Sequence, residues 1–273
     1  MPCTQTEVNR IRKILGDNTH ARLSGRGRYR CFRRYDPETR KLVGNVRFSG
    51  LTKRLEACIY SKAKLPISKG YHVKRTAEER RRWKGKTAGF RRGTDIDREL
   101  SKVANSRTGK VDHPKKLHRM TRLALAALRS DGLKLVRGQH PVVRSSGGVA
   151  TAIDLICVRI CNDDPDTREL ILVEIKTGYD KDRLRTRYKD GHELTMKTPL
   201  NSVCDNWCHR HMAQLASTWR MFVDNEQTIQ RLHDESNIRD ITGMLIYVTE
   251  RDIEAHALPE WWANMSSRLV HSL

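Results

Sequence analysis

Three charged residues interrupt or end otherwise apolar stretches of this 273-residue chain. Asp154 lies inside the run 152–160, and Glu174 and Lys176 lie at the end of the run 169–175. On a strand, Glu174 and Lys176 point to the same face, because they are two residues apart. Two carboxylates beside an ammonium group can hold a divalent cation and stabilise charge on a phosphate. A plainer alternative is an ion pair between Lys176 and Asp154 or Glu174.

The two runs are expected to form a β-hairpin. Both are apolar, and the polar segment 162–165, which contains a proline, separates them. A hairpin would bring Asp154, Glu174 and the carbonyl of Ile175 onto neighbouring strands. Hard cations prefer such oxygen ligands, and burial of the charges is costly unless they are paired or metal-bound. The hairpin therefore predicts a Mg²⁺ or Mn²⁺ site.

Other elements must hold this hairpin in place. The spacing of Ile96, Leu100 and Val103 predicts a helix that begins at residue 93 or 94, with Asp97 at the edge of its apolar stripe. Residues 116–130 predict a second helix, and residues 133–143 predict a strand interrupted at Pro141.

The chain after the hairpin predicts one helix and two strands. Residues 178–202 are polar, and loops of this length are usually functional or disordered. Residues 203–222 predict a helix that carries Gln214. Residues 241–248 predict a buried strand, and residues 253–259 a last short one.

Positive charge is concentrated at the beginning of the chain. Residues 1–92 hold 26 Lys and Arg against 7 Asp and Glu, whereas residues 93–273 hold 27 against 25. Such a field favours a polyanion, most simply nucleic acid, although a solubilising basic arm has the same composition. Around residues 24–35, Phe32 and Tyr35 are interleaved with arginines. This mixture can grip phosphate and stack on bases, or it can be an ordinary strand edge.

The remaining features indicate a soluble intracellular protein. No apolar run approaches the roughly 20 residues of a membrane span, and the N-terminal residues contain no secretory segment. Seven cysteines, an odd number, argue against a disulfide framework. Cys204 and Cys208, with His209 and His211 nearby, raise the alternative of a bound metal. Buried thiols that pack as small hydrophobic groups are the simpler interpretation.

Taken in order, these motifs resemble the core of the PD-(D/E)xK nucleases, and within them the RecB-like and lambda-type exonucleases. The resemblance covers residues 89–260. Its four motifs are residues 93–97 for the Gly-x3-His helix, Ile153-Asp154, Glu174-Ile175-Lys176, and Gln214 for the Gln-x3-Tyr helix. Asp97 stands in place of the histidine, with Glu99 as a second choice. Thr218 stands in place of the tyrosine, with Trp219 one step further.

The resemblance implies an α/β fold with a mixed central sheet flanked by helices over residues 89–273. Residues 1–88 would form a basic N-terminal extension that binds nucleic acid. The implied activity is that of a Mg²⁺-dependent deoxyribonuclease, most simply an exonuclease acting on DNA in repair, recombination or genome processing. A structure- or site-specific endonuclease and a non-catalytic binding protein on a nuclease fold are the alternatives.

The resemblance also implies a role for each site residue. Asp154, Glu174 and Lys176 would be catalytic. The metal ligands would be Asp97, Asp154, Glu174 and the carbonyl of Ile175. The contacts to DNA would come from Gln214, Arg91, Arg92, Arg183, Arg185 and Arg187.

Overall fold

The computed structural model describes residues 3–24, 31–61, 88–106, 117–144, 146, 148–177, 184, 188–189, 191–249 and 251–273. Residues 77–86, whose charged sequence predicts a helix, lie outside this part of the chain. The side chains of Arg91, Arg183, Arg185 and Arg187 also lie outside it. The sequence prediction for them therefore remains a prediction.

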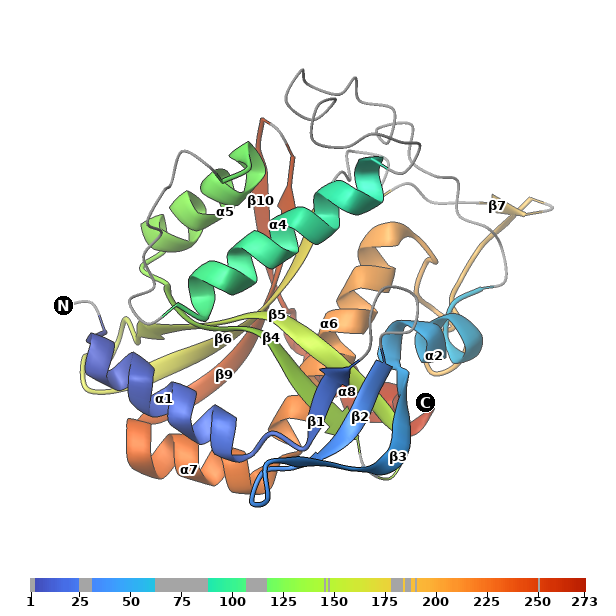
Figure 1. Cartoon of the computed structure of the whole chain (residues 1–273). Helices are drawn as coiled ribbons and strands as arrows, with labels where there is room; N and C mark the ends of the chain where they lie inside the picture. Colours follow the sequence, from blue (N-terminus) through green and yellow to red (C-terminus); the bar gives the residue numbers. More distant parts are fainter. Residues whose placement is uncertain are drawn as a thin grey trace.

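The described residues form an α/β fold (Figure 1). The helices are α1 (Gln5–Asp17), α2 (Leu51–Cys58), α4 (Ala88–Ala104), α5 (Arg119–Ser130), α6 (Trp207–Val223), α7 (Glu226–Ser236) and α8 (Glu260–His271). The strands are β1 (Ala21–Ser24), β2 (Cys31–Asp36), β3 (Lys41–Gly50), β4 (Lys134–Arg144), β5 (Val149–Ile160), β6 (Arg168–Thr177), β7 (Tyr188–Lys189), β8 (His192–Glu193), β9 (Ile238–Val248) and β10 (Ile253–Ala257).

Eight of the described strands form one mixed sheet. Its order is β1-β2-β3-β5-β6-β9-β10, and β4 pairs with β5 as well. The expected hairpin is confirmed, because β5 and β6 pair antiparallel, with Leu155 opposite Val173. On its other edge β6 pairs in parallel with β9. The expected mixed sheet flanked by helices is therefore present.

Strand β5 has three partners. It pairs with β4 along one edge, from Val149 to Val158. Its other edge is divided: β3 pairs in parallel with Val149 and Ala150, and β6 pairs antiparallel from Leu155 onwards. Asp154 lies in the gap between these two ladders, one residue before the pairing with β6 begins. The sheet forks at this residue, and the fork leaves room for its side chain.

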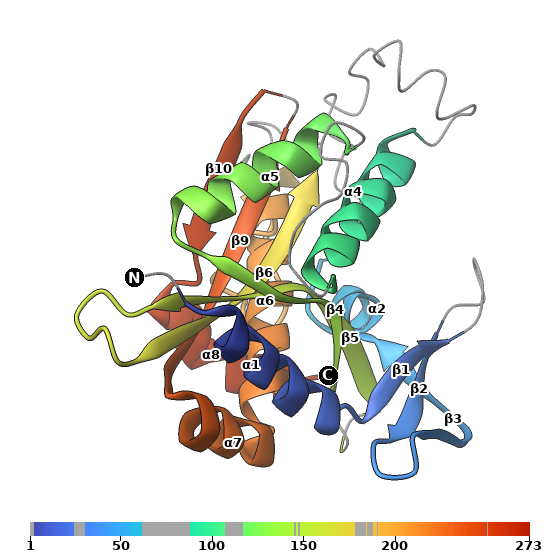
Figure 2. The ribbon, with the colours of Figure 1, turned by 60° about the vertical axis from the view of Figure 1, so that its left-hand side comes forward.

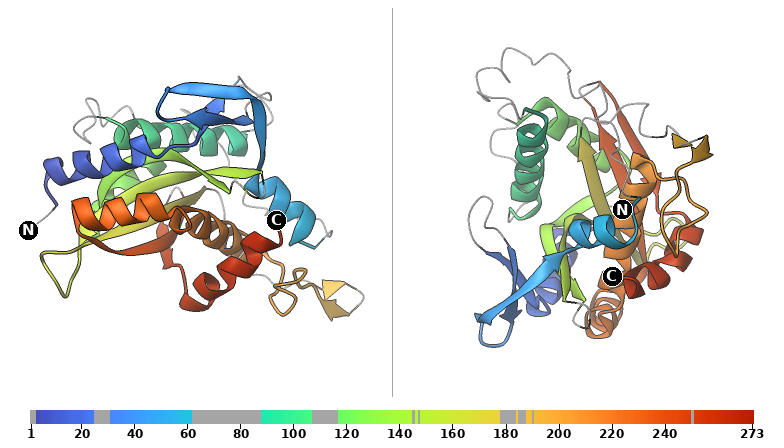
Figure 3. Two further views of the ribbon diagram at one scale, coloured as in Figure 1. Left: turned by 90° about the horizontal axis from the view of Figure 1, so that it is seen from below. Right: turned by 90° about the vertical axis from the view of Figure 1, so that its right-hand side faces the viewer.

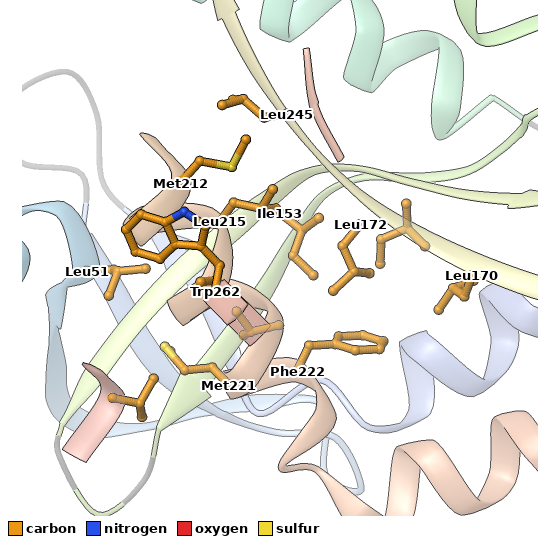
Figure 4. Close-up of a cluster of buried hydrophobic side chains, with 14 of the residues drawn as sticks. Leu51, Ile153, Leu170, Leu172, Met212, Leu215, Met221, Phe222, Leu245 and Trp262 are labelled. Carbon is orange, nitrogen blue, oxygen red and sulfur yellow. The ribbon is translucent and has the colours of Figure 1, made fainter. Parts of the chain in front are cut away.

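Two hydrophobic clusters cover the two faces of the sheet. Helices α4 and α5 pack on one face through a cluster that includes Ile96, Leu100 and Leu125. Helices α1, α6, α7 and α8 pack on the other (Figure 2). Figure 4 shows part of this larger cluster, in which Trp262 of α8 and Phe222 of α6 lie beside apolar side chains of β5, β6 and β9. Helix α2 also contributes to it.

The basic N-terminal region belongs to this same structure. Val8 and Ile11 of α1 and Leu55 of α2 are part of the larger cluster. Glu7 of α1 forms an ion pair with Arg168 of β6, at 2.6 Å. Strand β3 also joins the central sheet. The division expected at residue 88 therefore marks a change in charge composition. The described residues before it pack into the same core as the residues after it.

Two expectations about local structure are wrong, and two helices were missed. Strand β4 continues through Pro141, which pairs with Ala152. Proline is tolerated there because, among the described strands, β4 has its only partner in β5. Helix α4 begins at Ala88, before residue 93. Helices α7 and α8 were not expected; α7 buries only Thr228 and Leu232, so its sequence carries a weak apolar stripe. No described helix is long and apolar enough to cross a membrane.

His140 of β4 predicts a specific sensitivity to acid. Its ring is buried beside Phe222, and this burial, with the positive charge of Arg137, lowers the pKa of His140 to about 3. In the unfolded chain, the imidazole of His140 binds a proton as the pH falls below about 6.5. In the folded protein it stays neutral until about pH 3. Stability is therefore complete above pH 6.5 and falls as the pH drops below it, by at most about 1.4 kcal/mol per pH unit. His140→Leu should reduce this loss between pH 6.5 and 4 in urea unfolding.

A matched control for this prediction is His233→Gln, since His233 is exposed near the end of α7. Its unfolding free energy should still fall below pH 6.5, because His140 is intact. The same acid loss in His140→Leu as in His233→Gln would contradict the role of His140.

Candidate active site

Asp154 lies at the fork of the sheet, where its carboxylate takes the place of a backbone hydrogen-bond acceptor between β5 and β6. The backbone N–H of Ile175 donates to Asp154 Oδ2, at 2.8 Å. This bond joins β5 to β6 beyond the last backbone pair, Leu155 with Val173. The side chain is thereby fixed beside the Glu174-Ile175-Lys176 segment, as the hairpin predicted.

Gln139 is a residue of the site that sequence reasoning missed. It lies on β4 in a left-handed conformation, with φ +53°, which is uncommon for a residue with a side chain. Its Nε2 donates to Asp97 Oδ1 at 2.7 Å and to Asp154 Oδ1 at 3.1 Å. One amide thus bridges a carboxylate of α4 and a carboxylate of β5.

Helix α4 is held close to β4 at the residue before Gln139. A Cβ atom at Gly138 would lie 2.5 Å from the Cα of Ser101, so only glycine allows this approach. The side-chain amide of Asn105 accepts a bond from the Gly138 N–H at 3.0 Å and donates to the Gly138 carbonyl at 3.1 Å. This contact fixes the end of α4 on β4 and places Asp97, two turns earlier, beside the fork.

Glu174, Lys176 and Gln214 form a second group beside the first. Lys176 Nζ lies 2.6 Å from Glu174 Oε1 and 3.2 Å from Gln214 Oε1. Gln214 Nε2 donates to the same oxygen of Glu174, at 2.7 Å. The ion pair considered as the plainer alternative is therefore present between Lys176 and Glu174. It is mostly buried, since the two side chains are 17% and 4% exposed.

The site is built from both faces of the sheet. Gln214 comes from α6 and Asp97 from α4, and these two helices lie on opposite sides of β6 (Figure 3). Helix α6 is held at its start, where Arg210 and buried Asp205 form an ion pair at 2.5 Å. Asp205 also accepts the N–H of Ser61, at 2.6 Å. The residues after α2 thus help to position the helix that carries Gln214.

The surroundings raise the pKa of Asp154 well above its ordinary value of 3.8. The largest cause is burial of the carboxyl group, although the side chain as a whole keeps some accessible surface. The negative charges of Glu174 and Asp97 follow as causes, and Lys176 and the N–H of Ile175 oppose them. Three carboxylates thus face one ammonium group, and a bound cation would correct this imbalance.

The oxygen donors of the site are of the kind that suits Mg²⁺ or Mn²⁺, but the amide of Gln139 lies between two of them. Asp97, Asp154, Glu174 and the carbonyl of Ile175 are hard ligands of the kind these cations prefer. As the described residues stand, however, no three His, Cys, Asp or Glu side chains are arranged to hold a metal ion. The amide of Gln139 occupies the space between Asp97 and Asp154. A cation held between Asp97 and Asp154 would require this amide to move out or to turn its oxygen inward.

Several predicted site residues have other roles in the structure. Glu99 accepts bonds from the His118 N–H and the Thr121 hydroxyl, at 2.8 and 2.6 Å, and so joins α4 to α5. Arg92 is only 7% exposed, which does not support the prediction that it contacts DNA directly. Trp219 donates to the Ile241 carbonyl at 2.9 Å, and Thr218 is buried. Neither takes the place of the expected tyrosine.

The cysteines and histidines near residue 208 are engaged within the fold. Cys208 is buried, and its neighbour His209 lies 2.7 Å from the Cys204 carbonyl through Nδ1. His211 Nδ1 lies 3.0 Å from the hydroxyl of Tyr247. Cys157 is also buried, which raises the pKa of its thiol to about 12. Cys157 and Cys208 are thus buried within the fold, as the simpler interpretation expected, whereas Cys204 is half-buried.

We compared the chain with protein-family models, with curated proteins and with solved structures, and no significant match was found. The case for a function therefore rests on the chemistry of the residues described above.

Proposed function

We propose that this protein is a divalent-metal-dependent DNA nuclease with a PD-(D/E)xK active site, acting most simply as an exonuclease. One observation carries the proposal: Asp97, Asp154, Glu174, Lys176 and Gln214, which are far apart in the sequence, belong to two hydrogen-bonded groups that meet at the Glu174-Ile175-Lys176 segment, at the fork of the sheet. Gln139 and the N–H of Ile175 complete its connections. Such a concentration of partly buried charge is costly for stability, and active sites are the usual reason for it.

Each residue has a distinct task in this proposal. Asp97, Asp154, Glu174 and the carbonyl of Ile175 would hold the cation, and Gln139 would move aside. The bound cation would lower the pKa of a coordinated water and neutralise charge on the scissile phosphate. Lys176 would orient that water or stabilise the charge that develops on the phosphate.

Gln214 positions Lys176 and Glu174 relative to each other. Its oxygen accepts from the ammonium group, and its nitrogen donates to the carboxylate. The amide thereby fixes the ammonium and the carboxylate relative to each other. DNA contact by Gln214, implied by the resemblance, would use the same amide.

The charge of the chain supports DNA as the partner. The formal net charge is +21, and most of the excess lies in residues 1–92. Strands β1, β2 and β3 of this region carry Arg22, Arg33 and Arg47, and β3 ends where it pairs with the start of β5. A basic surface beside the fork would attract the phosphate backbone of the strand to be cut.

The test is digestion of end-labelled linear DNA and of covalently closed circular DNA, with Mg²⁺ and with EDTA. We expect Mg²⁺-dependent release of nucleotides from linear DNA only. Cutting of the closed circle would assign the same site to an endonuclease. Binding without any cutting would leave the protein as a non-catalytic nucleic-acid-binding protein and refute the enzyme proposal.

A further inference from the structure

A cavity of about 290 Å³ lies between the β1–β2 hairpin and strand β4. Its walls include two guanidinium groups, those of Arg22 and Arg137, and two aromatic rings, those of Phe32 and Tyr35. No acidic residue lines it within the described part of the chain. Its volume is at the lower end of the range of small-molecule sites. The cavity therefore combines size, positive charge and aromatic surface.

The guanidinium groups of Arg22 and Arg137 are positioned to bind an anion. The guanidinium carbon of Arg22 lies 3.8 Å from the centre of the Tyr35 ring, so its planar group is held against that ring. Arg137 is half-buried, and among the described residues no carboxylate pairs with it. Its burial and the nearby charges of Arg22 and Arg12 lower the pKa of Arg137. An anion between the two guanidinium groups would relieve this repulsion.

The cavity shares one side chain with the candidate active site. Gln139 lines the cavity, and its Nε2 lies 2.7 Å from Asp97 Oδ1 and 3.1 Å from Asp154 Oδ1. Arg137 is two residues before Gln139 on the same strand. A DNA strand with its scissile phosphate at Asp154 would therefore have a neighbouring nucleotide at the cavity.

We propose that this cavity, the arginine pocket, binds a phosphate of the substrate strand next to the scissile one. The planar guanidinium groups of Arg22 and Arg137 would pair with phosphate oxygens. The ring of Phe32 would lie against the attached nucleotide in a way that tolerates any base, while the buried ring of Tyr35 holds Arg22 in place. This inference rests on the proposed nuclease function and adds its substrate subsite. A terminal phosphate and an internal one share this chemistry.

The experiment measures binding to short linear DNA that carries a 5′-phosphate, a 3′-phosphate or no terminal phosphate, in EDTA, where no cutting occurs. The variants are Arg137→Gln and, because Arg137 is half-buried, the exposed Arg22→Gln as well. Arg34→Gln on β2 is the control, since it also removes one exposed positive charge but does not line the cavity. Thermal unfolding verifies that each variant is folded.

We expect both pocket variants to bind at least about tenfold more weakly than the control, the loss that follows from removing one charge-assisted hydrogen bond. A loss confined to one phosphorylated end would assign the pocket to that terminal phosphate. An equal loss with all three DNAs would assign it to an internal phosphate. Binding by both variants equal to that of Arg34→Gln would overturn the inference.

Digestion with Mg²⁺ separates this inference from the proposed function. If the wild type cuts DNA while the pocket variants bind like the control, only the pocket is refuted. If the wild type does not cut DNA, the nuclease proposal fails, and with it the placement of the pocket beside a scissile phosphate.

Discussion

Lys176→Met is expected to lower Mg²⁺-dependent DNA cleavage by about a thousandfold, within the range that loss of a charge-stabilising or proton-transferring group produces. Methionine keeps the unbranched length of the side chain and removes only the ammonium group, which lies 2.6 Å from Glu174 and 3.2 Å from Gln214. The measurement is the single-turnover rate at saturating DNA, with DNA binding measured separately in EDTA.

The control is Lys102→Met, because Lys102 is an exposed lysine on α4. It should cleave at close to the wild-type rate. Binding of DNA in EDTA should survive in both variants, since one lysine is a small part of the basic charge. Cleavage by Lys176→Met at the wild-type rate would show that the buried ion pair with Glu174 is only structural.

Asp154→Asn is expected to abolish cleavage and, in EDTA at pH 8, to make the folded protein more stable. The pKa of Asp154 is raised above its ordinary value of 3.8, so the folded protein ionises this group less readily than the unfolded chain does. The contribution of Asp154 to stability is therefore complete below its ordinary pKa of 3.8. It is lost as the pH rises from there through the higher pKa that the group has in the folded protein. A neutral amide removes this loss, which we estimate at about 1–3 kcal/mol in chemical unfolding.

Gln139→Leu should act in the opposite direction under the same conditions. It removes the amide that donates to both Asp97 and Asp154 and leaves the two carboxylates facing each other. Its unfolding free energy in EDTA should fall, and the fall should shrink when Mg²⁺ is added, because the cation would take over the neutralising role. Lower stability in Asp154→Asn than in the wild type at pH 8 would contradict this electrostatic account.

The parts of the fold that sequence predicted are those with strong local patterns. The alternation of apolar runs and a proline-containing turn gave the β5–β6 hairpin, and the spacing of Ile96, Leu100 and Val103 gave α4. Asp154, Glu174 and Lys176 were noticed because charge is unusual at the ends of buried strands. All three belong to the site, and so does Gln214.

The parts that sequence missed depend on contacts between distant segments. Gln139 is an ordinary polar residue by composition, and only its conformation and its place opposite Asp154 reveal it. The nearest local signal was Gly138, a glycine inside a strand, which often marks a close backbone approach. The spacing of Val8, Ile11, Ile14 and Leu15 does predict a short amphipathic helix that ends near Gly16, and α1 confirms it. What the high charge of residues 1–88 concealed is that this helix packs into the larger core cluster. The pairing of β3 with β5 joins residues 100 positions apart, and no local pattern encodes it.

The place of β6 between β5 and β9 has a consequence for biosynthesis. A ribosome releases the chain from the N-terminus, so Asp97, Asp154 and Lys176 emerge long before β9, which begins at Ile238. Until β9 is made, the strand that carries Glu174 and Lys176 lacks its parallel partner, and pairing between such distant segments is slow. A nascent or prematurely terminated chain therefore lacks an assembled site. Under the proposed function, the capacity to cut nucleic acid would arise only after β9 has been made.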